Sequence, residues 1–108
     1  MQKIGFIGCG HMAKAIIKGL QKNTAYSITG HDRNTSNLAW LAEESIPEKN
    51  LKNICNESDI IMICVKPKDM YDLCLSLNEI VDKQTKIVSV AAGVTLENLK
   101  NALPGRKL

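Results

Sequence analysis

The sequence predicts an α/β fold built on a doubly wound parallel sheet, and three features indicate it. Short apolar runs at residues 60–65 and 87–91 are continuous rather than alternating, which is typical of parallel strands covered on both faces. Stretches with helical spacing of apolar residues separate these runs. The length of 108 residues fits one compact domain. We therefore treat residues 1–108 as a single domain.

Strands and helices are expected to alternate along the chain. Strands are predicted at residues 4–7, 27–31, 60–65 and 87–91. The first helix should begin at a glycine turn, with an apolar stripe of Met12, Ala15, Ile16, Gly19 and Leu20. Further helices are predicted around residues 35–42, 67–80 and 95–103. Residues 46–56 hold either a very short strand or a turn followed by a helix near residues 51–55.

Composition excludes several other classes of protein. The longest apolar run has six residues, far short of the ~20 that a transmembrane helix needs, and the amino terminus lacks the apolar core of a signal peptide. We therefore expect a cytoplasmic protein without a membrane partner. The formal charge of +3 is spread along the chain and aromatic residues are few, so nucleic acid is not an expected partner.

The four cysteines do not have the spacing of a metal site. No two of them form a C-x-x-C pair, and only two histidines are available to help. We expect no metal, and we interpret Cys64 and Cys74 as small buried side chains.

The first predicted strand leads into the string Gly8-Cys9-Gly10-His11-Met12-Ala13, which has the pattern G-x-G-x-x-A. In such a loop the first glycine permits a tight turn, the second lets a pyrophosphate approach the backbone, and the alanine lets the helix pack closely. N–H groups at the positive end of the helix then bind the phosphates. The pattern predicts a dinucleotide-binding loop, with a simple connecting turn as the alternative. His11 is expected to cover the loop rather than to transfer protons.

Two neighbouring residues at the end of the second strand favour different cofactors. The carboxylate of Asp32 can accept hydrogen bonds from ribose hydroxyls and would repel a 2′-phosphate, whereas Arg33 can pair with that phosphate. Asn34 can bind the phosphate or cap the next helix. The choice between NADH and NADPH stays open.

Two further segments are predicted to face the cofactor. The string Val65-Lys66-Pro67 follows the strand at residues 60–65, and Ala91-Ala92-Gly93 follows the strand at residues 87–91. Ligands of open parallel sheets bind at the carboxyl ends of the strands, near the point where the strand order reverses. An exposed turn with an ordinary surface lysine is the alternative for Lys66.

At these positions the sequence resembles the amino-terminal domain of the pyrroline-5-carboxylate reductases, which complete proline biosynthesis. The matching strings are IGFIGCG at residues 4–10, VKP at residues 65–67 and VSVAAGVTL at residues 88–96. The resemblance spans essentially all 108 residues. It implies a Rossmann-like domain and an oxidoreductase that transfers a hydride from a reduced nicotinamide to the C=N carbon of a cyclic imine, giving L-proline.

The resemblance also implies which residues contact the cofactor. Those near the pyrophosphate are Ile7, Gly8, Cys9, Gly10, His11 and Met12. Those near the adenosine ribose are Asp32, Arg33 and Asn34. Those near the nicotinamide are Cys64, Val65, Lys66, Pro67, Val90, Ala91 and Ala92. The family usually prefers NADPH and often has Asn or Ser at the position of Asp32, so Asp32 puts that preference in question.

Members of this family continue past the position of Leu108 through a sixth strand into a helical domain that dimerises and closes the substrate site. We therefore expect residues 1–108 to be a truncated dinucleotide-binding domain that carries no catalytic residue and has no reductase activity alone. The parent enzyme is expected to be a homo-oligomer, and the edge of the strand at residues 87–91 should promote self-association. The alternative is a stand-alone, non-catalytic dinucleotide-binding module or a decayed relative.

Overall fold

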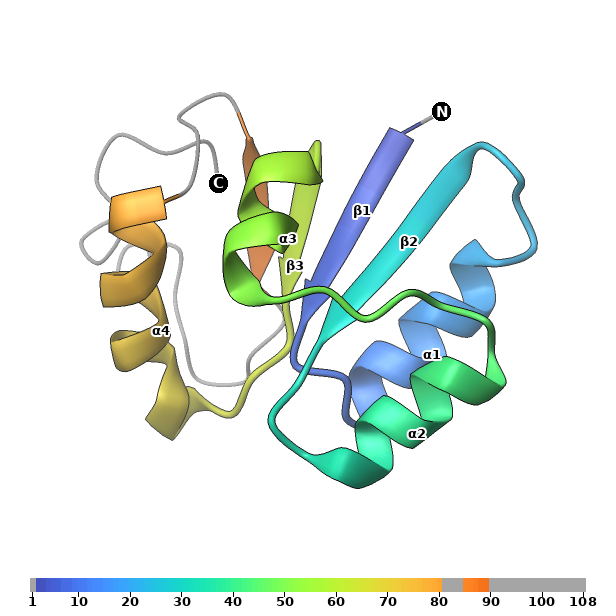
Figure 1. The fold of residues 1–108 in the computed structure, drawn as a ribbon, viewed down its shortest axis with the longest axis horizontal. Coiled ribbons are helices and arrows are strands. Elements are labelled where there is room, and N and C mark those ends of the chain that lie inside the picture. Colours follow the sequence, from blue (N-terminus) through green and yellow to red (C-terminus); the bar gives the residue numbers. More distant parts are fainter. Residues whose placement is uncertain (1, 81–84, 90–108) are drawn as a thin grey trace.

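The computed structural model describes residues 2–80 and 85–89, which form four parallel strands and four helices (Figure 1). The strands are β1 (Gln2–Ile7), β2 (Tyr26–His31), β3 (Ile60–Ile63) and β4 (Lys86–Ser89). The helices are α1 (His11–Leu20), α2 (Thr35–Glu43), α3 (Leu51–Glu57) and α4 (Pro67–Ile80). The predicted fold class is confirmed.

The strand order is β2-β1-β3-β4, so the chain reverses its direction of travel across the sheet between β2 and β3. Ile7 of β1 is in register with His31 of β2 and with Ile63 of β3. The carboxyl ends of these three strands therefore lie at the same level. A sheet that is wound in two directions opens a crevice at this edge, beside the first strand.

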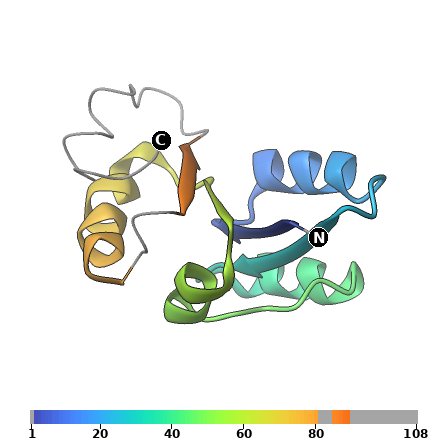
Figure 2. The same cartoon turned by 90° about the horizontal axis from the view of Figure 1, so that it is seen from above.

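Both faces of the sheet are covered, which explains why β1 and β3 contain consecutive apolar residues. Ile4 and Phe6 of β1 pack in a cluster with Ile17 of α1 and Leu41 of α2. Successive side chains of a strand point to opposite faces, and Ile7 accordingly joins the other cluster. From above, α1 and α3 lie on opposite sides of the sheet (Figure 2).

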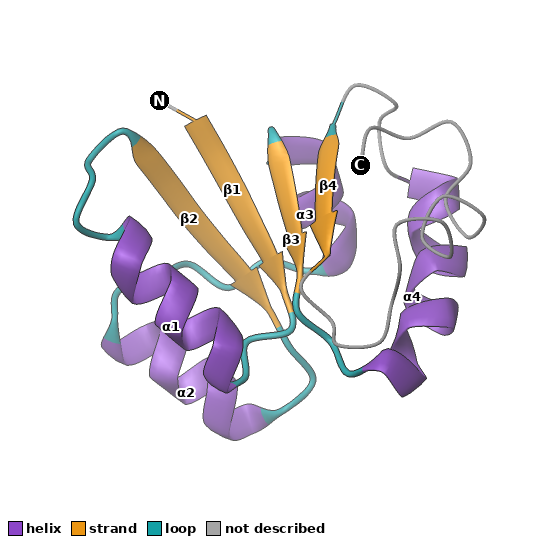
Figure 3. Cartoon of the chain, turned by 180° about the vertical axis from the view of Figure 1, so that it is seen from behind, coloured by secondary structure: helices purple, strands orange, loops and turns teal. Residues whose placement is uncertain are grey.

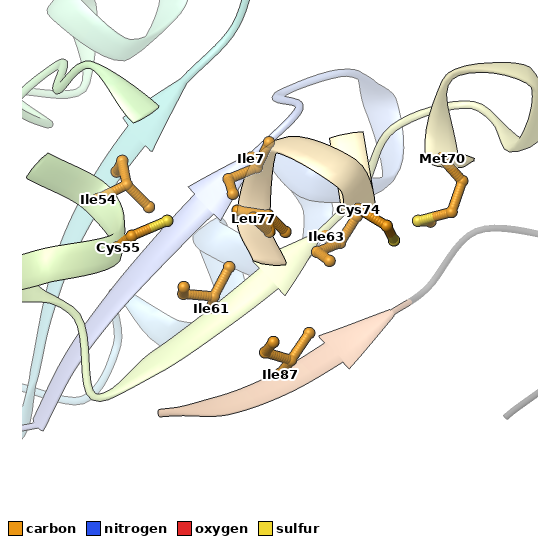
Figure 4. Packing of buried hydrophobic residues seen from close by; sticks show 9 residues of the cluster. All are labelled: Ile7, Ile54, Cys55, Ile61, Ile63, Met70, Cys74, Leu77 and Ile87. Atoms are coloured by element: carbon orange, nitrogen blue, oxygen red, sulfur yellow. The ribbon is translucent and has the colours of Figure 1, made fainter. Parts of the chain in front are cut away.

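The second cluster joins α3 and α4 to the sheet (Figure 4). Its buried members are Ile7, Ile54, Cys55, Ile61, Ile63, Met70, Cys74, Leu77 and Ile87. Met70, Cys74 and Leu77 recur at spacings of three and four along α4, so they form one stripe that faces β3 and β4. This part of the predicted helical pattern is confirmed, and Cys74 is buried as expected.

The apolar stripe predicted for the first helix is confirmed at Ile16 and Leu20, which pack against the core, and is wrong at Met12, Ala15 and Gly19. Met12 is 57% exposed and Ala15 and Gly19 are also exposed, whereas Ala13 and Ile17 are fully buried. Ala13 and Ile17 are four residues apart, so they share the face that packs on the sheet. Ala13 is small enough for the close approach that the loop pattern predicted.

Helices α1 and α2 lie side by side (Figure 3). Lys18 of α1 forms a salt bridge with Glu44, which follows α2. The ammonium group of Lys14 lies 5.7 Å from the centre of the Trp40 ring, within range of a cation–π contact. These side-chain contacts connect α2 to α1 at the surface.

The segment at residues 46–56 folds as a turn and a helix, which was one of the two predicted alternatives. Only a single bridge, between Gly30 and Glu48, remains of a strand here. It is held by hydrogen bonds from Gly30 N to Pro47 O and from Lys49 N to Gly30 O. Helix α3 follows because Ile54 and Cys55 bury one side of it against the sheet.

Other predicted boundaries differ slightly. Strand β3 ends at Ile63, two residues before the predicted end, because the chain turns toward Pro67, which starts α4. The predicted strand at residues 87–91 is seen as β4 up to Ser89, and the predicted helix at residues 95–103 lies outside the described residues. No helix in the described ranges is long and apolar enough to span a membrane.

Candidate functional site

A cavity of about 450 Å³ lies at the carboxyl ends of β1, β2 and β3. Its walls come from the loop after β1, the loop after β2, the segment after β3 and one side of α4. The lining residues are Ile7, Gly8, Cys9, Gly10, His31, Asp32, Arg33, Asn34, Asn37, Leu51, Cys64, Val65, Lys66, Lys68, Asp69, Asp72, Leu73 and Ser76. The topology therefore brings together segments that are far apart in the sequence, as expected at a strand-order reversal.

Most of the predicted site residues line this cavity. They are Ile7, Gly8, Cys9, Gly10, Asp32, Arg33, Asn34, Cys64, Val65 and Lys66. His11 and Met12 are exposed in the first turn of α1, outside the set of lining residues. Pro67 is the first residue of α4. Val90, Ala91 and Ala92 lie outside the described residues.

Gly8 is required by the fold itself. Its φ angle is +89°, in the region that side chains disfavour, and a Cβ there would lie 2.8 Å from the backbone carbon of Cys64. Its N–H donates to the carbonyl oxygen of His31 at 2.8 Å. Gly8 thus forms the tight turn that the pattern predicted, with β3 packed directly against it.

The fold does not require a glycine at position 10, in contrast to Gly8. Its backbone is extended, with φ −76° and ψ −163°, and a Cβ there would meet no atom within 4 Å. It precedes α1, and no side chain caps that helix. In contrast, the side chains of Asn34 and Asn50 accept N–H groups at the starts of α2 and α3. The start of α1 therefore presents backbone N–H groups to the surroundings.

The carboxylate of Asp32 accepts hydrogen bonds from the glycine loop and from the start of α2. Its Oδ1 atom accepts the backbone N–H of Asn34 at 2.8 Å. Its Oδ2 atom accepts the backbone N–H of Cys9 at 2.6 Å and the side-chain amide of Asn37 at 3.0 Å. Asp32 thus joins the end of β2 to the glycine loop and to the first turn of α2.

This environment keeps Asp32 ionised. Partial burial by itself raises the pKa of a carboxyl group, because it disfavours the charged form. Here the hydrogen bonds from Asn34, Cys9, Asn37 and the backbone of Arg33 together outweigh burial, so the pKa of Asp32 lies below its ordinary value of 3.8. A fixed negative charge therefore stands beside the predicted ribose position.

The two cysteines of the cavity carry protonated thiols. Burial, reinforced by the nearby charge of Asp32, raises the pKa of Cys9 to about 11. Burial, reinforced by Cys9, raises the pKa of Cys64 to about 12. Cys9 is fully buried as a packing residue, whereas Cys64 is only half-buried, so its predicted burial is wrong in degree. No group of three or more potential metal ligands occurs among the described residues.

Sequence reasoning missed several residues of the site. Asn37 lies in the first turn of α2, where polar residues are common for reasons of capping alone. Lys68, Asp69 and Asp72 come from α4, whose polar side faces the cavity. Lys66, by contrast, was predicted because it directly follows the predicted strand at residues 60–65. The only signal for the α4 residues was the polar side of an amphipathic helix, which is usually a solvated surface.

The parallel sheet, its order and the glycine loop define a Rossmann-like domain of the kind found in NAD(P)-dependent oxidoreductases. The family model described as "NADP oxidoreductase coenzyme F420-dependent" matches residues 3–93. The chain belongs to this family, and the dinucleotide-binding domain predicted from the sequence is confirmed.

Curated relatives refine this assignment. The chain is 33% identical to the "Pyrroline-5-carboxylate reductase" of Pasteurella multocida over 113 aligned positions, covering 98% of this chain and 41% of the relative. It is 34% identical to the enzyme of the same name from Escherichia coli, covering 94% of this chain and 40% of the relative. The chain thus spans about two fifths of the length of these relatives, and the resemblance seen in the sequence is confirmed.

Solved structures agree with the fold. A pyrroline-5-carboxylate reductase from Coxiella burnetii matches with a TM-score of 0.84 and 26% identity, covering 94% of this chain and 39% of that chain. A prephenate dehydrogenase from Aquifex aeolicus, solved with NAD+, also has a TM-score of 0.84, at 18% identity, covering 99% of this chain and 40% of that chain. The second similarity concerns the fold alone.

Proposed function

We propose that this chain binds the diphosphate of NADPH or NADH at the glycine loop and forms the dinucleotide-binding domain of a pyrroline-5-carboxylate reductase. The observation that carries the proposal is the open space beside Gly10. The fold does not need glycine there, since the backbone is extended and a Cβ would meet nothing within 4 Å. A ligand that approaches the backbone closely accounts for the residue.

The start of α1 supplies the donors for this diphosphate. The first hydrogen bond of the helix runs from Lys14 N to Gly10 O at 2.9 Å. The N–H groups of the preceding helical residues, His11 to Ala13, therefore have no partner within the helix. They stand at the positive end of the helix dipole, where an anion is stabilised.

The remaining contacts follow the order of the segments around the cavity. We assign Ile7 to Met12 to the diphosphate and Asp32 to Asn34 to the adenosine ribose. Cys64 to Pro67 and Val90 to Ala92 are assigned to the nicotinamide half. The side chains of Asp32, Lys66 and Cys64 supply the negative, positive and uncharged parts of this surface.

The substrate assignment rests on the relatives, which are named pyrroline-5-carboxylate reductases. When bound, a reduced nicotinamide would supply a hydride to the imine carbon of pyrroline-5-carboxylate, and uptake of a proton from water at the ring nitrogen would complete proline. The residues of this chain bind and orient the cofactor, and none is assigned to acid–base chemistry. Hydride transfer needs the reacting atoms about 3–3.5 Å apart, so the rest of the enzyme has to hold the imine.

Substitution of Gly10 tests cofactor binding. Gly10→Val fills the space beside the loop without touching the chain, so we expect an unchanged fold and at least a tenfold loss of affinity for both cofactors, or about 1.4 kcal/mol. Gly19→Val is the matched control, because a Cβ at Gly19 also meets nothing within 4 Å and Gly19 is near the far end of α1. Equal affinity in both variants and the unchanged protein would refute the binding role.

A chimeric enzyme tests the assignment to this reductase. Residues 1–108 replace the matching 40% of the Escherichia coli relative, and the chimera is assayed for proline formation from pyrroline-5-carboxylate. We expect activity that Gly10→Val abolishes and Gly19→Val retains. A folded chimera that binds the cofactor but forms no proline would contradict the assignment while leaving the binding site intact.

Two further parts of the proposal concern association and location. Strand β4 is the last strand of the described sheet, and we expect chains to associate through residues 87–91, because sheet edges recruit other strands. Light scattering over a concentration series tests this, and a monomer throughout would contradict it. The proposal also puts the enzyme in the cytoplasm, which cell fractionation tests.

A further inference from the structure

Asp32 and Asn37 form the contact that carries an inference about cofactor choice. We propose that Asn37 is a positioning residue that holds the Asp32 carboxylate against the glycine loop and thereby makes this chain bind NADH in preference to NADPH. The inference rests on the proposed dinucleotide-binding function. It adds which of the two cofactors is selected, and by which side chain.

The Asp32 carboxylate is an ionised acceptor at the end of β2. Its Oδ2 atom accepts the Cys9 N–H and the Asn37 side chain, and its Oδ1 atom accepts the Asn34 N–H. A ribose hydroxyl can donate a hydrogen bond to such a charged acceptor. An ionised 2′-phosphate offers no hydrogen to donate and brings a charge of about −1.5 to −2, so it is repelled.

The preference for NADH over NADPH depends on the Asp32 carboxylate keeping its position beside the glycine loop. A carboxylate that can rotate away from the ribose leaves space for a phosphate, and the exposed side chain of Arg33 is the neighbouring cation that would pair with it. In the part of the chain that the structure describes, no salt bridge engages Arg33. A fixed Asp32 carboxylate should therefore produce the difference in affinity between NADH and NADPH.

Asn37 donates to Asp32 through its side chain, so a substitution can remove this hydrogen bond. The other donors are backbone N–H groups, which every residue except proline supplies. Among residues 2–80 and 85–89, Asn37 is the one residue whose side chain donates a hydrogen bond to Asp32, from a half-buried position in α2. Its own backbone N–H is engaged separately, by the Asn34 side chain at 3.3 Å. A substitution of the Asn37 side chain thus removes one bond to Asp32 and leaves the helix cap in place.

The test compares three forms of the 108-residue chain. Asn37→Leu keeps the volume of the side chain and removes the donor. Asn53→Ala is the control, since Asn53 is an exposed asparagine of α3 that does not line the cavity. Calorimetric titration gives the dissociation constants for NADH and NADPH, and circular dichroism checks the fold. The ratio of the two constants is the readout, because a merely structural role would weaken both cofactors alike.

We expect the unchanged chain and Asn53→Ala to bind NADH more tightly than NADPH. In Asn37→Leu the ratio should move about tenfold toward NADPH, the value of one hydrogen bond to a charged group. An unchanged ratio in a folded Asn37→Leu protein, or a preference of the unchanged chain for NADPH, would overturn the inference while the binding function stands. Failure of the unchanged chain to bind either cofactor would overturn the proposed function itself.

Discussion

The Oδ2 atom of Asp32 lies 2.6 Å from the backbone nitrogen of Cys9, so the end of β2 is bonded directly to the glycine loop after β1. The bond joins residues that are 23 positions apart in the sequence. It orders the loop and holds the carboxylate at one place in the cavity. The same contact therefore contributes to the stability of the domain and to the shape of its site.

Acid should weaken the domain through Asp32. The pKa of Asp32 in the folded chain lies below its ordinary value of 3.8, because hydrogen bonds from Asn34, Cys9 and Asn37 outweigh partial burial. Its contribution is therefore present above pH 3.8 and is lost as the pH falls through the lower, folded value. We expect urea unfolding to show a smaller loss of stability between pH 6 and acid in Asp32→Asn than in the unchanged chain.

Asp72→Asn serves as the control for this pH series. Asp72 is exposed on α4, and no hydrogen bond to its carboxylate is found within residues 2–80 and 85–89. Its substitution removes one carboxylate without removing any of the hydrogen bonds of Asp32, so it is the matched comparison for Asp32→Asn. The attribution to Asp32 would be wrong if both variants changed the acid response equally.

Gly8 and Gly10 should respond in opposite ways to the same small change. Gly8→Ala places a side chain at φ +89° and brings its Cβ to 2.8 Å from the Cys64 backbone, so we expect a loss of about 3 kcal/mol or more in the free energy of unfolding. Gly10→Ala meets no atom within 4 Å and should stay within about 1 kcal/mol of the unchanged chain. Chemical denaturation measures both, and similar losses in the two variants would contradict this distinction.

Much of the sheet was predictable because its strands are buried on both faces. A continuous run such as residues 60–65 is unusual at a surface, and Gly8, Gly10 and Asp32 stand at fixed places relative to such runs. The residues between 46 and 56 have no clear apolar pattern, so the sequence was compatible with either a short strand or a helix there. The burial of Ile54 and Cys55 against β1 and β3 decides for the helix, and that is a tertiary effect.

The candidate site was predictable only where residues directly follow a strand. Asp32 directly follows β2 and Lys66 directly follows the predicted strand at residues 60–65, and both line the cavity. Asn37 and Asp72 reach the cavity from helices, at distances from the strand ends that depend on how each helix packs. The register of α1 shows the same difficulty, since Met12 and Ala13 are both apolar and only packing shows that Ala13 is the buried one.

Asn34 should contribute to stability as a helix cap. Its side chain accepts the N–H groups of Ser36 at 2.8 Å and of Asn37 at 3.3 Å. We expect Asn34→Ala to lower the free energy of unfolding by about 1 kcal/mol, whereas Asn34→Ser, which retains a capping oxygen, should lose much less. Thermal and urea unfolding of the two variants measure the difference. Equal stability of the two would show that the cap is unimportant.

The thiols of the cavity should be unreactive at neutral pH. Burial raises the pKa of Cys9 to about 11 and that of Cys64 to about 12, from an ordinary value of 9.0. Only the thiolate is nucleophilic, so we expect alkylation by iodoacetamide at pH 7.5 to be at least about a hundredfold slower than in the unfolded chain. The rate should rise as the pH approaches 11.

Mass spectrometry of the labelled peptides assigns the reaction to each cysteine, and Cys64→Ser isolates the contribution of the half-buried thiol. Labelling in guanidinium chloride, where all four cysteines are accessible, is the reference. The buried Cys55 and Cys74 should also stay unlabelled in the native chain, because burial raises the pKa of each of these thiols. Rapid modification of Cys64 at pH 7.5 would mean that its environment stabilises the thiolate, which contradicts the desolvated position that the structure gives it.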